Sequence, residues 1–421
     1  MLQNDPELFE LSMSEKTQPL MDLVKKHCEE NIKPIQQEYS ALQNEKEDRW
    51  SWHPRQIELM EGAKEKAREL GLWNFFLPDP DGNIGDGLTN LDYTYVASEI
   101  GKYPLASESM NCSAPDTGNM EVLERVGTEE QKKQWLEPLL NGEIRSAYAM
   151  TEPNLASSDA KNISTSAVLD GDEWVINGHK WFTSNGHAAD FYIVMCRTSD
   201  ESDPSGENSK MTQIIVPKNT PGVNVVRGVP VWGKPSSHCE IVYDNVRVPK
   251  ENQLGQTGSG HQAAQDRLGA GRVYHCMNSI GSMWRAFDLM VSRLKTREVH
   301  GGEKLADKHF MQGFVADSYI DIQSARLMTI HCAEKMESGD DPRTDISAIK
   351  VYVPNAYHRV VDRAIQVYGA AGVSGDLPLA GMYEGARTLR IADGPDEVHK
   401  VLIAKLVMRQ YEEGDSWDFG N

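Results

Sequence analysis

The sequence is poor in cysteine and in basic side chains, and it lacks any long apolar run. Its six cysteines form no C-x-x-C pair and have no companion histidine at a zinc-site spacing, so we expect no bound metal and reduced thiols in the core of an intracellular protein. Basic residues number 43 against 63 acidic ones, and the net charge of −20 disfavours nucleic acid and anionic membranes as partners. No stretch reaches the roughly 18 apolar residues that a membrane-spanning helix requires, so we expect no transmembrane span.

No import signal is recognised at either end of the chain. Residues 1–15 are acidic and contain Pro6, a composition that fits neither a secretory signal nor an Arg-rich organelle presequence. The C-terminal residues 418–421 do not form the tripeptide that directs peroxisomal import. A cytoplasmic location is therefore expected.

The periodicity of apolar residues divides the chain into three parts. Residues 1–143 have helical spacing, and Thr128 with Gln131 predicts a capping box that opens a helix ended by Gly142. Residues 144–257 alternate over short segments, and residues 258–421 return to helical spacing. The predicted fold class is α+β, mainly α, with an N-terminal helical domain, a middle antiparallel β domain and a C-terminal helical bundle.

Individual elements of the middle and C-terminal parts can also be predicted. Strands are expected at 174–176, 191–195, 213–216 and 240–243, with a polar surface loop at 198–210. Two apolar stripes predict the core of a bundle of roughly four helices. The first stripe consists of Val273, Met277, Ile280, Trp284, Phe287 and Met290, and the second of Phe314, Tyr319, Ile322, Ala325 and Leu327.

The chemistry-bearing segments of the middle part are residues 149–159 and 180–185. Pro153 and the small residues after it interrupt a strand pattern, which leaves backbone N–H groups free to face a ligand. The hydroxyls of Thr151, Ser157 and Thr183 can bond a polar ring edge, while Trp181 offers a flat apolar wall. This mixture suits a flavin ring. The alternative is a Ser/Thr-rich turn between two ordinary strands with a tryptophan in the core.

These two segments, together with the helical, sheet, helical order of the whole chain, resemble the acyl-CoA dehydrogenase family. The resemblance implies FAD as cofactor, an acyl-CoA thioester as substrate, and α,β-dehydrogenation in fatty acid metabolism. It also implies an electron-transfer flavoprotein as electron acceptor. The family forms homotetramers or dimers in which FAD contacts two subunits.

The resemblance assigns roles to residues that match family positions. Met150, Thr151, Trp181 and Thr183 would contact the flavin, and Ser157 or Ser158 would lie near the CoA moiety. Arg272 and Gly394 would lie at the substrate. The FAD-binding set continues with Arg297, Gln366 and Gly369. Two departures concern this part of the FAD site: Ala370 replaces a family glycine, and the segment after Arg297 lacks the usual aromatic residue.

The resemblance places the catalytic base at Asp393, where most family members carry a glutamate. Aspartate is shorter by one bond, or ~1.5 Å, so the backbone or the substrate must come closer. The segment Tyr383-Glu384-Gly385 resembles the family pattern but is interpreted as a turn on the approach to the last helix. The string 393–399 resembles the branch that in animals is joined to a kinase-like domain and is associated with 4-hydroxy- and 4-phosphoacyl-CoA substrates.

Alternatives remain open at this point. His399 and Lys400 could touch a phosphorylated substrate, although an exposed helix histidine and lysine is the favoured interpretation. A same-fold oxidase of nitroalkanes or acyl-CoA could also use an aspartate base with oxygen as acceptor. A non-catalytic flavin-binding relative or a bare helical scaffold is the third possibility.

Overall fold

The computed structural model describes residues 12–42, 45, 52–77, 88–157, 159, 162–198, 210–338 and 341–412. Ser158, most of the predicted surface loop at 198–210, and the chain ends at 1–11 and 413–421 lie outside the described residues. The chain forms two compact units. We call residues 34–74 and 108–270 the sheet unit, and residues 1–33, 75–107 and 271–421 the helical unit. The boundaries between the units fall within helices α5 (Ala106–Ser109) and α9 (Gly260–Thr296).

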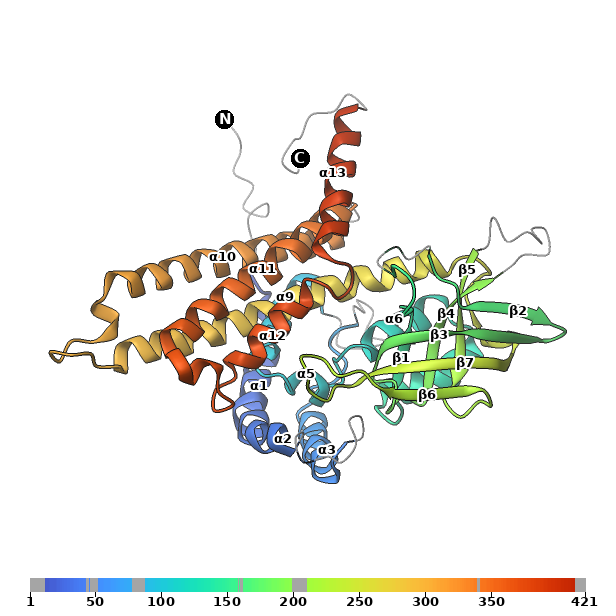
Figure 1. Ribbon diagram of the computed structural model, residues 1–421, viewed down its shortest axis with the longest axis horizontal. Coiled ribbons are helices and arrows are strands. Elements are labelled where there is room, and N and C mark those ends of the chain that lie inside the picture. The colour runs from blue at the N-terminus through green and yellow to red at the C-terminus, as the bar shows by residue number, and fades with distance from the viewer. Residues whose placement is uncertain are drawn as a thin grey trace. The chain divides into compact units, whose positions relative to one another are not determined.

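The sheet unit is built on an eight-stranded sheet (Figure 1). Its strands are β1 (Ser146–Ala149), β2 (Ser166–Asp170), β3 (Glu173–Ser184), β4 (Phe191–Thr198), β5 (Lys210–Pro217), β6 (Val223–Gly228), β7 (His238–Pro249) and β8 (Gln253–Leu254). The order is β6-β7-β3-β2-β4-β5-β8, and β1 pairs with β4. All four predicted strands are confirmed, within β3, β4, β5 and β7. Most pairs are antiparallel, but β4 pairs in parallel with β1 and β2.

Strand β4 shows why this sheet has a mixed centre. Residues 191–196 are all buried, so the strand has no solvent face and reads as a continuous apolar run. Tyr192 and Val194 pack with Ile176 of β3 and Ile241 of β7 in the main core of the sheet unit. A strand covered on both faces suits a central position with neighbours of either direction.

The helices of the sheet unit confirm the predicted capping box. They are α2 (Gln36–Leu42), α3 (Pro54–Glu69), α6 (Asp116–Val126), α7 (Glu129–Gln131) and α8 (Glu137–Leu140). The Thr128 hydroxyl accepts a hydrogen bond from the Gln131 N–H at 3.2 Å, and the Gln131 side chain accepts one from the Thr128 N–H at 3.0 Å. Gly142, at φ +69°, follows α8, as predicted.

The helical unit is dominated by long helices. They are α1 (Gln18–His27), α4 (Asn90–Ile100), most of α9, α10 (His309–Ser338), α11 (Arg343–Tyr368), α12 (Leu379–Leu389) and α13 (Asp396–Glu412). Helix α11 contacts α10, α12 and α13, and α10 and α11 lie side by side in Figure 1. Gly281 of α9 allows close packing against α4, because a Cβ atom there would overlap the Ser98 carbonyl oxygen.

The two predicted apolar stripes differ in outcome. On α9, Val273, Met277, Ile280 and Met290 are buried. On α10 the prediction is wrong for Tyr319 and Leu327, whose exposed fractions are 55% and 49%. The buried face of α10 instead follows positions 318, 321, 322, 325 and 329, and the two exposed residues lie outside that helical spacing.

Two predictions from composition can be compared with the structure. All six cysteines are buried, and none forms a disulfide. Among the described helices, none combines the length and the apolar character needed to cross a membrane.

Candidate active site

The predicted base lies in an unusual turn of the helical unit. We call residues 390–396, which connect α12 to α13, the Asp393 turn. Asp393 adopts φ +55° and Gly394 φ +99°, so two successive residues have left-handed backbone conformations. Such a conformation is strained for a side chain like that of aspartate and persists only where the surroundings hold it.

Cationic and imidazole side chains from other helices hold the backbone of this turn. Arg272 of α9 donates from Nε to the Asp393 carbonyl oxygen at 2.9 Å. Lys350 of α11 donates from Nζ to the carbonyl oxygens of Leu389 at 2.6 Å and Gly394 at 3.3 Å. The Lys350 side chain is fully buried, and burial lowers its pKa although the Asp393 carboxylate acts in the opposite direction. The main chain around Asp393 is therefore fixed by donors from two separate helices.

The carboxylate of Asp393 has its own partner. His275 of α9 lies with Nε2 at 3.1 Å from Asp393 Oδ2. The His275 side chain is 29% exposed and the Asp393 side chain 26% exposed. His275 follows Arg272 by one helical turn, so the same face of α9 holds both the carbonyl group and the carboxylate of Asp393.

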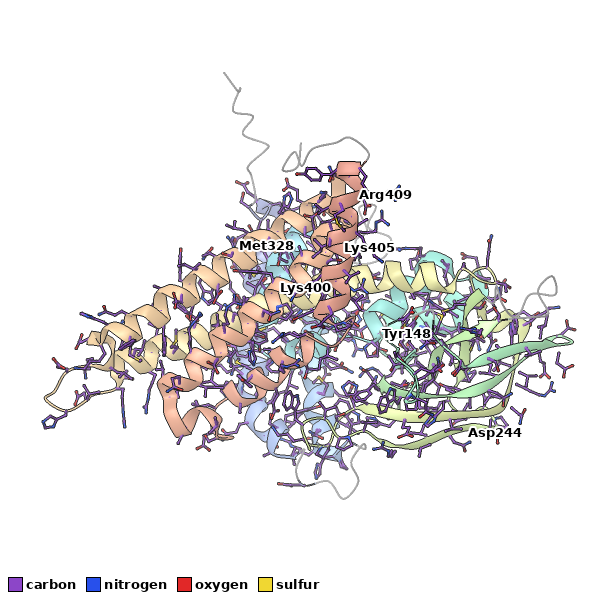
Figure 2. All side chains as sticks on the ribbon, turned by 45° about the horizontal axis from the view of Figure 1, so that its top comes forward. Tyr148, Asp244, Met328, Lys400, Lys405 and Arg409 are labelled. Atoms are coloured by element: carbon purple, nitrogen blue, oxygen red, sulfur yellow. The ribbon has the colours of Figure 1, made fainter. Side chains whose placement is uncertain are left out.

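His399 is buried beneath the turn, and its predicted exposure is wrong. Its ring bonds the Asp393 carbonyl oxygen through Nε2 at 3.2 Å and the Ser347 hydroxyl through Nδ1 at 3.3 Å. Burial, with Arg272 adding to it, lowers the pKa of His399 to about 4. The neutral ring therefore donates from Nε2 to the carbonyl and accepts from Ser347. The neighbouring Lys400 is exposed on α13, as predicted (Figure 2).

The end of the turn is tied to the start of α13. Asp396 is buried, and its Oδ2 accepts hydrogen bonds from Arg390 Nε at 2.9 Å and from Asn355 Nδ2 at 3.0 Å. An acidic residue in the first turn of a helix is also favoured by the helix dipole. The turn is therefore closed on itself by the pair that Arg390 and Asp396 form.

The competing acidic segment has a different structure. Tyr383, Glu384 and Gly385 lie within α12, so the predicted turn at this position is wrong. Apolar residues at 379, 382, 386 and 389 recur at helical spacing and explain why the segment is helical. The Glu384 carbonyl accepts a hydrogen bond from the Thr388 hydroxyl at 2.8 Å, an ordinary contact inside a helix.

The two segments predicted to face a flavin lie side by side in the sheet unit. The backbone N–H of Trp181 donates to the Thr151 carbonyl at 3.0 Å, and the Thr151 hydroxyl donates to the Trp181 carbonyl at 2.8 Å. The pairing of β3 with β7 shifts between Lys180 and Thr183, and Phe182 within this bulge has φ +49°. A bulge re-aims side chains and is common beside active sites.

A buried ion pair stabilises this segment. Lys180 Nζ bonds Glu152 Oε1 at 2.9 Å and the Met150 carbonyl at 2.8 Å, and both charged side chains are almost fully buried. Burial would raise the pKa of Glu152, but Lys180 and hydrogen bonds from Ser164 and Thr165 lower it to about 2. The pair therefore joins the residues after β1 to β3.

The hydroxyls of Thr183 and Ser157 differ in their hydrogen-bond partners. The Thr183 hydroxyl is buried and has no hydrogen-bond partner among the described residues. Such a group fits a site whose remaining partner is a bound polar ring. The Ser157 hydroxyl, by contrast, accepts from the Glu152 N–H at 2.9 Å and lies 3.2 Å from the Glu152 carbonyl, so it is used within its own loop. Met150 and Trp181 are half-buried.

The remaining predicted cofactor residues lie at helix ends of the helical unit. Arg297 follows α9 and is exposed, and Gln366 is exposed in the last turn of α11. Gly369 ends α11 at φ +63°, a conformation that favours glycine. The Tyr368 hydroxyl donates to the Leu289 carbonyl at 3.1 Å and so joins the end of α11 to α9.

Sequence reasoning missed His275 and Lys350. His275 could have been found from its spacing of one helical turn after Arg272. Lys350 occupies a position beside Ile346, Ile349 and Val353, on the face of α11 that periodicity predicts to be buried. A buried lysine rarely occurs without a function or a set of acceptors.

Known proteins share the three-part organisation of this chain. The chain matches family models described as the acyl-CoA dehydrogenase N-terminal domain at residues 14–143, middle domain at 147–246 and C-terminal domain at 258–408. It is 43% identical to mouse "Acyl-CoA dehydrogenase family member 10" over 94% of this chain and 37% of that protein. It is 47% identical to "Probable acyl-CoA dehydrogenase FadE2" of Mycobacterium tuberculosis over 82% of this chain and 85% of that protein.

A solved structure shows the same fold. The Mycobacterium abscessus protein of the same family name has a TM-score of 0.88 and 38% identity, with 95% of this chain and 100% of that chain covered. The chain spans little more than a third of the mouse relative and about half the length of the family member 11 proteins that it matches.

Proposed function

Because the chain belongs to the acyl-CoA dehydrogenase family, we propose that it is an FAD-dependent enzyme that dehydrogenates an acyl-CoA thioester between its α and β carbons. The observation that carries this proposal is the Asp393 turn. There, side chains from other helices hold a left-handed turn that carries a partly exposed carboxylate.

Asp393 is the proposed base for the α-proton. An ionised carboxylate can accept this proton if it lies within hydrogen-bond reach of the carbon, and its oxygen must be aimed correctly. Arg272, His399 and Lys350 fix the main chain of the turn. The fixed main chain keeps the shorter aspartate side chain from moving away from the substrate. The shortened side chain therefore depends on a rigid turn.

Met150, Thr151, Trp181 and Thr183 are the residues proposed to hold the flavin. The bulged β3 segment and the unpartnered Thr183 hydroxyl support this assignment. Bound flavin would supply a hydride acceptor for the β-carbon. Arg297, Gln366 and Gly369 are proposed to contact FAD of a neighbouring subunit in a dimer or tetramer, which fits their exposed positions at helix ends.

The finer assignment concerns the substrate and the electron acceptor. We propose a 4-hydroxy- or 4-phosphoacyl-CoA, because the string 393–399 resembles the branch associated with these compounds. The cationic side chain of Arg272 beside the turn is partly exposed and is compatible with an anionic substrate. An electron-transfer flavoprotein is the proposed acceptor.

The test is anaerobic reduction of the FAD-loaded protein by defined thioesters. Butanoyl-, octanoyl- and palmitoyl-CoA, each with its 4-hydroxy and 4-phospho counterpart, should bleach the flavin absorbance at different rates, and the 4-substituted chains should be fastest. A protein that takes up no FAD, or whose flavin no thioester bleaches, would contradict the proposal. Oxygen consumption with peroxide formation at the rate of turnover would instead favour the oxidase alternative.

A further inference from the structure

The contact of His275 with Asp393 differs in kind from the other contacts of the turn. Arg272 and His399 bond the Asp393 carbonyl, and Lys350 bonds the carbonyls of Leu389 and Gly394. These bonds fix the main chain. His275 lies instead against the carboxylate itself, with Nε2 at 3.1 Å from Oδ2. His275 therefore contacts the side chain of Asp393, whereas the other three residues hold the main chain of the turn.

We propose that His275 is a positioning residue for Asp393: the contact of its Nε2 with Oδ2 orients the carboxylate for removal of the α-proton. This inference rests on the proposed function of Asp393 as the base. It goes beyond that proposal because it assigns to a side chain on α9 the role of orienting the base.

Elementary hydrogen-bond chemistry fixes the proton on His275. An ionised carboxylate can only accept hydrogen bonds, so Nε2 of His275 must carry the hydrogen. The second nitrogen, Nδ1, has no hydrogen-bond partner among the described residues, and the side chain is 29% exposed.

Several charged or titratable groups besides His275 face the base. They are Arg272 on α9, Lys350 on α11 and His399 on α13, while Arg390 and Asp396 pair with each other within the same turn. The pKa of His399 is lowered to about 4, so this histidine stays neutral near pH 7. A hydrogen-bond donor favours the ionised form of a carboxylate. Removal of His275 should therefore move the acid limb of the deprotonation profile to higher pH.

The experiment uses a thioester that reports α-deprotonation alone. In 3-thiaoctanoyl-CoA a sulfur atom replaces the β-carbon, so no β-hydride can leave, and the enolate formed by loss of the α-proton gives a long-wavelength absorbance band beside oxidised flavin. The band is measured against pH in the FAD-loaded full chain and in His275→Gln and His275→Phe. The glutamine amide can place an N–H donor near the position of Nε2, whereas phenylalanine keeps the ring shape without a donor.

The expected result distinguishes a polar contact that orients Asp393 from a role of His275 in packing alone. His275→Phe should slow band formation by roughly 10- to 100-fold and move its acid limb upward, while His275→Gln should stay within a few-fold of the unmodified protein. If His275→Phe fails to bind FAD, His275→Asn, whose amide is too short to reach, takes its place. His331→Phe is the matched control, because His331 on α10 lies 3.9 Å from Asp345 in a more exposed pair, and it should change nothing.

Two outcomes would overturn the inference. The first is a His275→Phe variant whose rate of band formation and acid limb are unchanged. The second is a His275→Gln variant that is as slow as His275→Phe and has an unshifted acid limb, which would indicate that His275 acts through packing alone. Asp393→Asn distinguishes this failure from that of the proposed function. If Asp393→Asn still forms the band, or if the unmodified protein forms none, the assignment of the base fails and the role of His275 fails with it.

Discussion

Glu384 and Asp393 are two carboxylates on neighbouring stretches of the chain, and their surroundings differ sharply. Glu384 lies in the regular helix α12, where its backbone makes ordinary helical contacts. Asp393 lies in a left-handed turn fixed by Arg272, Lys350 and His399, with His275 against its carboxylate. The contrast supports the proposal of Asp393 as the base, although the local sequence around Glu384 resembles the family pattern more closely.

The largest expected effect tests the two carboxylates directly. Asp393→Asn removes the proton acceptor with little change in shape, so bleaching of the flavin by acyl-CoA should slow by at least ~100-fold while FAD binding is kept. Glu384→Gln is the matched control and should stay within about twofold. Stopped-flow absorbance under anaerobic conditions measures both. An equal loss of bleaching rate in the two variants would contradict the proposal that Asp393, and not Glu384, is the base.

Lys350→Met should be the most destabilising change near the turn. It leaves the carbonyls of Leu389 and Gly394 without their donor in a buried environment, and we expect a loss of about 2 kcal/mol in the free energy of unfolding. Denaturant unfolding of the FAD-loaded protein measures it. Lys335→Met, which breaks a partly exposed pair with Asp345, should cost less than about 1 kcal/mol. A smaller loss for Lys350 than for Lys335 would show that the turn does not depend on it.

Two glycines sharpen the comparison of helix and turn. A Cβ atom on Gly394 would lie 2.9 Å from His399 Nε2, and its φ of +99° disfavours any side chain. Gly394→Ala should therefore cost ~1–3 kcal/mol and slow bleaching. Gly385 in α12 has open space around its Cβ position, so Gly385→Ala should stabilise the helix by up to about 1 kcal/mol. Thermal melts of the two variants measure whether each substitution stabilises or destabilises the protein. If Gly385→Ala destabilises it and Gly394→Ala does not, the expected contrast between helix and turn is wrong.

The last expected effect concerns pH. The pKa of His399 is lowered from 6.5 to about 4 in the folded protein, so the unfolded chain binds more protons between these values. Stability is then fully present above pH 6.5 and is lost as the pH falls toward 4. His399→Gln should lose less stability than the unmodified protein over this range. His27, with its pKa also lowered to about 4, remains in both proteins and cancels. Identical slopes of unfolding free energy against pH would contradict the burial of a neutral His399.

Much of the fold follows from local sequence. The Thr128 capping box and the four strands were predictable because propensity, capping and alternation agree within a few residues. The exposure of Tyr319 and Leu327 was not, since both are apolar residues that lie just outside the buried face of a long helix. The parallel pairs of β4 also escape prediction, because pairing direction depends on partners far along the chain.

The candidate site was less predictable than the fold. Asp393 was predicted as the base through family resemblance. His275, which contacts it, and Lys350, which holds the turn, come from α9 and α11, which are distant in sequence and carry no motif. The exposed interpretation of His399 failed because its burial depends on how α13 packs against α11. Side-chain partners across helices are tertiary information, which a single sequence expresses only as an isolated polar residue on an apolar face.

The most direct measurement follows deuterium entering the α position of 3-thiaoctanoyl-CoA in D₂O. The thioester is incubated with the FAD-loaded protein, with Asp393→Asn and with Glu384→Gln, and its mass is followed over time. The account predicts rapid exchange with the unmodified protein and with Glu384→Gln, and exchange at least ~100-fold slower with Asp393→Asn. Exchange by Asp393→Asn at the unmodified rate would show that another group removes the proton.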